Sequence, residues 1–431
     1  MERFIGVLGV FVLMGIAWLL STNRRAINWR TVGVGVTLQV AFALLILRTS
    51  PGKMVFEAAR SFISNILSYT DQGAYFIFGN LYLSASNIAS NIPGAMLDQG
   101  FSVLDPRSGQ MVEIGTVFAF HVLPTIIFFA SLMALLYHLG VMQQIVRVFA
   151  WLMKRTMKTS GSESLSAASN IFVGQTEAPF VVKPFLAKMT NSEIMAVMTA
   201  GFATVAGGVL AAYVRFGIDA GHLMAASLMS APAALVMAKI MVPEVETSET
   251  ADSMKMHVEK AYSNPIDAAA GGASDGLKLA VNVAAMLIAF IALVAMINGL
   301  LGWVGGLFGI ENLTLRLILG YIFSPLAFVM GVDWADALDV GSLLGAKITI
   351  NEFLAFIDLG ALHGQISDRS YIIATYALTG FANFSSIAIQ IGGIATLVPE
   401  RRATLARYGL RAMIAGALAS WQTAAIAGIL L

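Results

Sequence analysis

Long apolar runs, each close to the length that crosses a lipid bilayer, constrain the fold of this 431-residue chain more than any other feature. A helix needs about 20 apolar residues to span the hydrocarbon core. In lipid, only helices and closed barrels satisfy every backbone polar group. Hydrophobic residues make up 58% of the sequence and charged residues only 12%. The sequence therefore predicts an all-α polytopic membrane protein.

Eight of these runs are predicted to form full transmembrane helices. They are residues 4–20, 31–47, 117–139, 194–213, 222–242, 277–301, 371–397 and 405–431. The first is interpreted as a crossing helix and not as a cleaved signal peptide, because its arginines follow the apolar stretch. A further stretch, Phe56 to Leu67, has apolar residues at helical spacing and is predicted to lie in the membrane interface.

Two other regions, residues 163–190 and 311–357, do not fit simple spans. The first is broken at Gly174 and Pro179, and the second holds two short apolar runs separated by aspartates. Irregular backbone at membrane depth is tolerated only where protein shields it or where it lines a cavity. Each region is therefore predicted to form a re-entrant helical hairpin. The longest polar stretch, residues 243–264, is too short to fold separately, so residues 1–431 are predicted to form one membrane domain.

The two hairpins also suggest an internal repeat. Glu177 is followed 27 residues later by the small, hydroxyl-bearing stretch that begins at Thr204, and Glu352 is followed 31 residues later by the stretch Asn383 to Ser386. A hairpin followed by an interrupted helix thus occurs twice. Inverted repeats with interrupted segments in corresponding positions are typical of secondary transporters whose site lies at mid-membrane.

The charged residues predict the topology and exclude some partners. Of the 26 basic residues, 17 fall on the side that carries the segments after the first, third, fifth and seventh spans. Cytoplasmic loops carry an excess of lysine and arginine, so both termini are predicted to lie outside. A net charge of +1 gives no reason to expect a nucleic acid partner, and the absence of cysteine excludes disulfides and thiolate metal ligands.

The stretch Asn170 to Pro179, which reads NIFVGQTEAP, is the strongest candidate for a binding site. It places a carboxylate, two amides and a hydroxyl in an otherwise apolar environment. A charge at membrane depth is costly, so it usually faces a cavity and marks a substrate or ion path. The five histidines are scattered at spacings that do not suit a metal site, and are interpreted as structural or solvated.

Three separated motifs carry a resemblance to a known family. They are GQTEAP at 174–179, NEF at 351–353 and GFANFSS at 380–386. With their order along the chain, they resemble the concentrative nucleoside transporters, in particular the bacterial sodium-coupled members, and the likeness runs along nearly the whole chain. The resemblance implies a secondary active symporter in the bacterial inner membrane that imports nucleosides of the uridine, cytidine or adenosine type with sodium.

The resemblance further implies a homotrimer in which each protomer has two parts. A scaffold makes the trimer contacts, with elements expected mainly in residues 1–50 and 277–303. A transport part moves across the membrane like an elevator, and includes hairpin one at 163–190 and hairpin two at 311–357.

The resemblance implies that separate groups of residues bind the two parts of the nucleoside, its base and its ribose. Gln175, Thr176 and Glu177 would face the nucleobase, with Val209 packing beside it. An amide such as Gln175 suits a base edge because it can both donate and accept.

The ribose would be held from the other side of the site. Glu352, Asn383 and Ser386 are expected to bind its hydroxyls, and Phe381 to form an aromatic wall. An ionised carboxylate can accept two hydroxyl donors in strong, charge-assisted hydrogen bonds.

The family's sodium site corresponds here to Asn170, Val173, Thr204 and Val205. A hard monovalent cation is bound by oxygen atoms, which unwound backbone supplies. Better-studied bacterial members have serine where this chain has Thr204, and the threonine hydroxyl offers the same oxygen.

Other functions stay open at this stage. Proton-coupled nucleoside symport is the runner-up, although Asn170 and the intact GQTEAP motif favour sodium. An intramembrane enzyme would use Glu177 and Glu352 as paired carboxylates, but the sequence supplies no metal centre or activated nucleophile, so no enzymatic activity is expected. A channel would show flux without gradient-driven accumulation.

Overall fold

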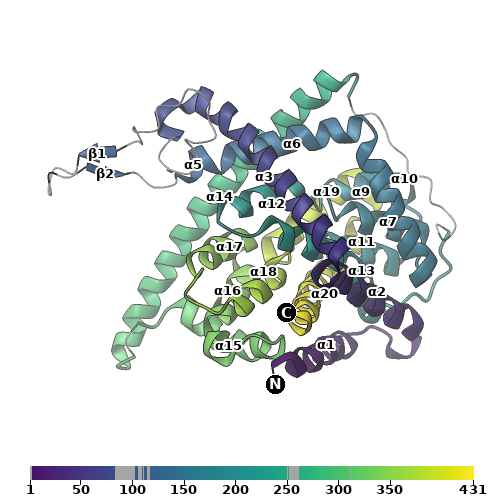
Figure 1. Ribbon diagram of the computed structural model, residues 1–431. Helices are drawn as coiled ribbons and strands as arrows, with labels where there is room; N and C mark the ends of the chain where they lie inside the picture. The colour runs from purple at the N-terminus through teal and green to yellow at the C-terminus, as the bar shows by residue number, and fades with distance from the viewer. Residues whose placement is uncertain are drawn as a thin grey trace.

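The protein is a helical assembly with one small β-hairpin at its edge (Figure 1). The computed structural model describes residues 2–82, 102–104, 109, 111–113, 117–249, 251, 262–310 and 312–431. Strands β1 (Ser102–Leu104) and β2 (Met111–Glu113) pair antiparallel. The prediction of a helical membrane protein is confirmed, and the two short strands are an addition that it missed. Half of the predicted linker 243–264, namely residues 250 and 252–261, lies outside the described residues.

The helices follow one another with short connections along the chain. They are α1 (Glu2–Leu19), α2 (Trp29–Arg48), α3 (Ser50–Phe78), α5 (Phe118–His121), α6 (Leu123–His138), α7 (Val141–Met157), α8 (Gly161–Ser169), α9 (Ala178–Val181), α10 (Lys183–Leu186), α11 (Asn191–Ala203), α12 (Gly207–Arg215), α13 (Ala220–Met241), α14 (Pro265–Leu307), α15 (Leu315–Val329), α16 (Ala337–Thr349), α17 (Glu352–Ala361), α18 (Asp368–Leu378), α19 (Phe384–Leu397) and α20 (Arg402–Leu430). Short 3-10 turns lie at Arg24–Ala26 (η1), Gly79–Tyr82 (η2), Trp334–Asp336 (η3) and Pro399–Arg401 (η4).

Among the described residues, six helical stretches are long and apolar enough to cross a membrane. They coincide with six of the eight predicted spans. The first predicted span corresponds to a shorter apolar helix within α1. The seventh is divided between α18 and α19, of which α19 is a shorter apolar helix. The interfacial prediction for Phe56 to Leu67 falls inside the longer helix α3. Its position in an interface and the number of crossings stay predictions.

The core of the molecule is built around α11, α13 and α20. These three helices contact one another, and more than four fifths of each of their spanning stretches is buried. Small residues allow the close approach: a Cβ on Gly416 of α20 would lie 2.4 Å from the Cβ of Phe202 on α11. Helices α1 and α2 pack onto α13 and α20, whereas α14 packs mainly onto α6 and leaves most of its surface exposed.

Both predicted helix interruptions are confirmed. Helix α11 ends at Ala203, with Thr204 as its C-cap, and α12 begins after Ala206. Helix α18 ends at Leu378, with Thr379 as its C-cap, and α19 begins after Asn383. Each interrupted helix contacts a helix of the hairpin region before it, α11 with α8 and α18 with α16. The chain thus repeats the same sequence of elements in its two halves.

The second hairpin region is divided differently from the sequence expectation. Three aspartates are predicted to separate its two apolar runs. Asp333 and Asp336 lie in the connection between α15 and α16, which pack against each other, and Asp339 lies in the first turn of α16. Glu352 follows a separate break at Ile350 and Asn351, between α16 and α17. The break before Glu352 is only two residues long, which explains why hydropathy did not reveal it. Residue 311, the first of the predicted hairpin, lies outside the described residues.

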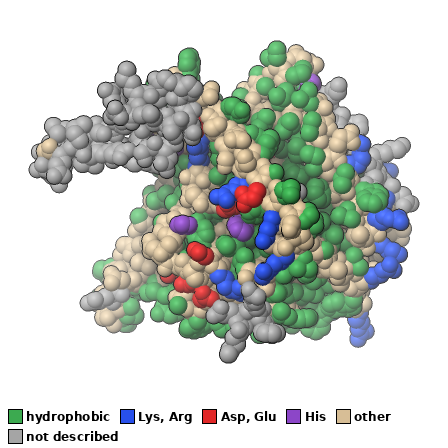
Figure 2. Space-filling view, in the orientation of Figure 1, with side chains coloured by type: hydrophobic (Ala, Val, Ile, Leu, Met, Phe, Trp, Pro, Cys, Tyr) green, Lys and Arg blue, Asp and Glu red, His purple; other side chains and the backbone are tan. Residues whose placement is uncertain are grey.

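Helix α3 lies across one face of the assembly, in front of α12 (Figure 1), where basic and acidic side chains gather in the middle of the view (Figure 2). Asp71 of α3 forms a buried ion pair with Arg215 of α12 and accepts a hydrogen bond from the Tyr82 hydroxyl at 2.6 Å. Nearby, Arg60 of α3 pairs with Asp219 at 3.1 Å, just before α13. These two ion pairs connect α3 to the α12–α13 corner.

Asp71→Asn is expected to lower the free energy of unfolding by about 3 to 5 kcal/mol, because it leaves the Arg215 guanidinium as an unpaired buried charge. The matched control is Asp339→Asn, which breaks an exposed pair with Arg316 and should cost less than about 1 kcal/mol. Thermal and denaturant unfolding of the purified protein in detergent measures both. Equal losses in the two variants would show that burial does not govern the Asp71 pair.

Candidate functional site

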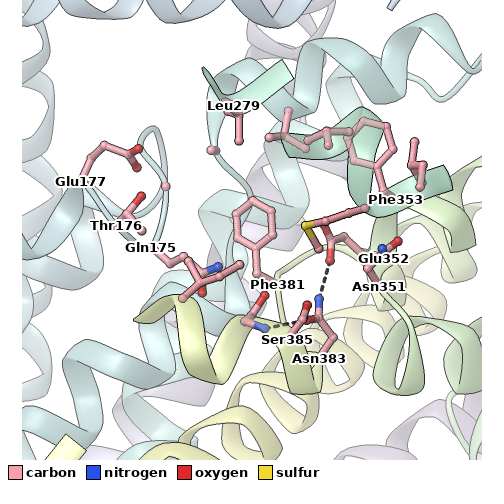
Figure 3. Close-up of a pocket in the computed structure, with 18 residues that line it drawn as sticks. Gln175, Thr176, Glu177, Leu279, Asn351, Glu352, Phe353, Phe381, Asn383 and Ser385 are labelled. Atoms are coloured by element: carbon pink, nitrogen blue, oxygen red, sulfur yellow. Dashed lines mark hydrogen bonds between the residues drawn. The ribbon is translucent and has the colours of Figure 1, made fainter. Parts of the chain in front are cut away.

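The site is a pocket between the two repeated halves (Figure 3). The space that its residues line amounts to about 740 Å³, a figure that includes open solvent. The structure brings all eight predicted substrate residues to its lining: Gln175, Thr176, Glu177, Val209, Glu352, Phe381, Asn383 and Ser386. Their ligand-binding roles stay predictions, but their convergence from four separate segments is a property of the fold.

One side of the pocket is the turn between α8 and α9, which carries Gln175, Thr176 and Glu177. Gly174 comes directly before these three residues. Glycine suits this position, because a Cβ there would lie 2.4 Å from a carboxylate oxygen of Glu177. The side-chain oxygen of Gln175 is buried and accepts no hydrogen bond from the described residues. Buried polar atoms normally have a partner, so this amide oxygen is available to a ligand donor.

The opposite side is organised around the carboxylate of Glu352, the first residue of α17. One carboxylate oxygen accepts a hydrogen bond from the Tyr213 hydroxyl at 3.1 Å, and the other accepts one from the Asn383 amide at 2.8 Å. The carboxylate also lies at a helix N-terminus, where the helix dipole favours negative charge. Each oxygen keeps further lone-pair capacity, so the group can still accept from ligand hydroxyls.

Asn383 is oriented by its role as the N-cap of α19. Its side-chain oxygen accepts hydrogen bonds from the Ser386 backbone at 2.9 Å and from the Ser385 hydroxyl at 2.7 Å. Since that oxygen is occupied, the amide nitrogen faces Glu352. Asn383 and Ser386 are therefore joined by a capping turn at the interruption.

Tyr213 is a site residue that the sequence reasoning missed. It is fully buried, and its ring stacks on Phe356 at a centroid distance of 4.2 Å. It lies one helical turn after Val209, on the same helix α12. The four-residue spacing from Val209 is the sequence signal for Tyr213, because residues four apart share a helix face.

A second group of polar atoms lies behind the first turn, where the predicted sodium residues are. Asn170 is 1% exposed, and its amide nitrogen donates to the Ser166 carbonyl at 2.9 Å. Its side-chain oxygen is buried and accepts no hydrogen bond within the described part of the chain. The backbone of Gly207 donates to the Phe172 carbonyl at 3.1 Å, which ties this turn to the α11–α12 interruption.

The interruption supplies further oxygens. The Thr204 hydroxyl donates to the Ala200 carbonyl at 2.9 Å, which leaves its lone pairs free. In the described ranges, the backbone carbonyls of Val173, Thr204 and Val205 accept no hydrogen bond. Oxygen-only ligands of this kind suit a hard cation such as sodium. The residues present therefore fit the predicted ion.

Comparisons with known families agree along most of the chain. Residues 8–81 match the N-terminus and residues 222–428 match the C-terminus of the Na+ dependent nucleoside transporters. Residues 119–220 match a segment described as nucleoside recognition.

Two relatives illustrate the range of similar proteins. The chain is 44% identical over 425 residues to the uncharacterized transporter YutK of Bacillus subtilis, and the match covers 98% of each protein. It is 41% identical over 446 residues to the human sodium/nucleoside cotransporter 1, a match that covers all of this chain and 64% of the longer human protein.

Solved structures of CNTnw are similar over the whole chain. CNTnw in an inward-facing substrate-bound state is 43% identical, with a TM-score of 0.88, and a double variant in an outward-facing state is 44% identical, with a TM-score of 0.90. Both matches cover 100% of this chain and 98% of the other.

Gly380→Ala is expected to lower the free energy of unfolding by more than about 3 kcal/mol, because it adds both backbone strain and overpacking. Gly380 has φ of +101°, and a Cβ there would lie 2.5 Å from the Phe202 carbonyl oxygen. The control is Gly217→Ala, with φ of +86° and open space around it. Strain alone should cost it about 1 to 2 kcal/mol. Equal thermal shifts would contradict a special contact at Gly380.

Proposed function

This chain belongs to the family of Na+ dependent nucleoside transporters, and on that basis we propose that it is a symporter that imports nucleosides with sodium across the bacterial cytoplasmic membrane. Its relatives are transporters, not enzymes. The observation that carries the proposal is the pocket in which Glu352, held by Tyr213 and Asn383, lies opposite the turn that bears Gln175.

The proposed nucleoside lies between these two sides of the pocket. The Gln175 amide, with its oxygen free, matches a base edge that offers both donors and acceptors. Thr176 and Glu177 extend this polar side, and Val209 adds an apolar contact. The rest of the lining includes apolar side chains such as Leu279 and Met286, which suit the faces of a planar base.

The ribose is proposed to bind at Glu352. Its carboxylate accepts from neighbouring hydroxyls, and Asn383 and Ser386 complete that end of the site. Phe381 lies between the two polar sides in Figure 3 and separates base from sugar. A site of this kind discriminates strongly against a ligand without the hydroxyls, because the buried carboxylate would lose its partners.

The sodium ion is proposed to bind at Asn170, Val173, Thr204 and Val205. One charge that moves through 100 mV releases about 2.3 kcal/mol. Since 1.4 kcal/mol is a factor of ten, the potential alone supports roughly 40-fold accumulation. Coupling requires that the ion stabilise the substrate-competent shape of the turn. Asn170 and Gln175 lie on the same turn, so an ion at the first would order the second.

Alternating access is proposed to be an elevator movement within a homotrimer. Helix α14 supports this proposal because it packs mainly on α6 and carries large exposed apolar side chains on its other surfaces, including Ile288, Leu300 and Trp303. Such a surface needs lipid or a neighbouring subunit. We propose that α6 and α14 belong to the scaffold. The contacts of α1 and α2 with α13 and α20 favour placing residues 1–50 with the transport part instead.

Replacement of sodium by choline is expected to abolish concentrative uptake of labelled uridine in proteoliposomes, since the ion supplies the driving force. An imposed proton gradient without sodium should not restore accumulation. Undiminished uptake in choline would overturn sodium coupling, and restoration by protons would assign the proton-coupled alternative. Both termini are proposed to lie outside, which cysteine labelling at the ends of the chain tests.

Glu352→Gln is expected to lower uridine uptake efficiency by about 100-fold, because the variant loses a charge-assisted acceptor and leaves one buried donor unpaired. Protein yield should fall much less. The control is Glu400→Gln, the same change at an exposed carboxylate, which should transport normally. Uptake at the wild-type rate in the Glu352 variant would refute its role in sugar binding.

A further inference from the structure

The two interruptions of the repeat end in the same local structure. Thr204 is the C-cap of α11, and Thr379 is the C-cap of α18. Each threonine hydroxyl is buried and donates to the carbonyl four residues before it, at 2.9 Å in both cases. Thr204 and Thr379 therefore mark equivalent positions in the two halves of the chain.

Helix ends of this kind create a shared electrostatic problem. The last carbonyls of a helix have no partner within it, and the helix dipole places partial negative charge there. In a membrane interior, water cannot solvate these oxygens. Each interruption therefore calls for a cation or a donor beside its carbonyl oxygens.

In the second half, a lysine side chain meets this need. Lys347 on α16 is fully buried, and its ammonium donates to the carbonyl oxygens of Ala377 and Thr379 at 2.8 and 2.9 Å. Its third hydrogen bond goes to the Ser420 hydroxyl of α20 at 2.9 Å. Ser420 itself donates to a carbonyl of its own helix. All three partners are thus acceptors, which satisfies the three donors of a charged ammonium.

In the first half, the oxygens beside the interruption have no such donor among the described residues. The carbonyls of Thr204 and Val205 and the side-chain oxygen of Asn170 are unoccupied within the described residues. They are the oxygens assigned above to sodium. The second half of the repeat therefore has the Lys347 ammonium at its interruption, whereas the first half has oxygens without a partner in the described residues.

We propose that the Lys347 ammonium takes the place of a second transported cation at the α18–α19 interruption, so that the protein carries one sodium ion per nucleoside. This inference rests on the proposed sodium site in the first half. Glu352 follows Lys347 by five residues, across the break between α16 and α17, and the ammonium directs its three hydrogen bonds to other groups.

The experiment compares two substitutions that remove the charge in different ways. Lys347→Ala leaves space in which a sodium ion can reach the carbonyls. Lys347→Met fills the same space with an apolar chain and leaves the carbonyls without a partner. A role in packing alone predicts that methionine is the better replacement, whereas the proposed role predicts that alanine is better at high sodium.

Uridine uptake is measured in proteoliposomes against sodium concentration at constant ionic strength. In Lys347→Ala, the Hill coefficient for sodium is expected to rise from about one to about two, since a second ion replaces the ammonium. Lys347→Met should lose at least about tenfold in uptake at every sodium concentration. The control Lys278→Ala removes a lysine that is 74% exposed, and should keep the wild-type sodium dependence.

A further test uses only the wild-type protein and does not depend on the folding of a variant. A reversal potential measures the net charge that is transported with each uridine. One net charge supports the proposal, and two overturn it. The proposal also fails if Lys347→Met transports normally, or if sodium does not restore Lys347→Ala. A wild-type protein without any sodium dependence would instead refute the proposed function, so the two failures are distinct.

Discussion

The need to satisfy backbone carbonyls inside a lipid-embedded core governs this structure. An unbroken helix satisfies them internally, but a binding site needs polar groups that a regular helix hides. The chain resolves this conflict by interrupting two helices, α11 and α18, and by bringing the interruptions together. Gly380 lies directly against the backbone of Phe202 and Ala203, so the two irregular segments shield each other. Everything polar in the pocket is held by these segments or by the turns beside them.

The buried charges, like the backbone carbonyls, have partners. Buried charges in the described core meet opposite charges or oriented oxygens, as Arg215 does with Asp71 and Lys347 does with two carbonyls. Glu352 accepts hydrogen bonds from Tyr213 of α12 and from Asn383, the N-cap of α19. Desolvated charges of this kind are costly when a partner is lost, which fixes the relative positions of the helices that carry them. The same interactions that make the pocket polar also make it rigid.

Much of this arrangement could be predicted from the sequence, and the rest could not for physical reasons. The motif GQTEAP and the stretch at Asn383 are polar in apolar surroundings, so they stand out. Tyr213 does not stand out, because a tyrosine in an apolar helix looks like packing until its hydroxyl is seen on Glu352. The partners of Lys347 could not be predicted, since they lie about 30 and 73 residues further along the chain. The second hairpin region was divided at Asp333 because a charged turn is a stronger signal in the sequence than the two-residue break at Ile350 and Asn351.

The distance along the chain between Lys347 and Ser420 has a consequence for biosynthesis. Helix α16 leaves the ribosome well before α20, and until α20 is inserted the lysine ammonium lacks one of its three acceptors. Helix α20 also packs against α1, α2, α11, α13 and α18, so it joins both halves. The packing of the second half is therefore completed only after α20 has been inserted.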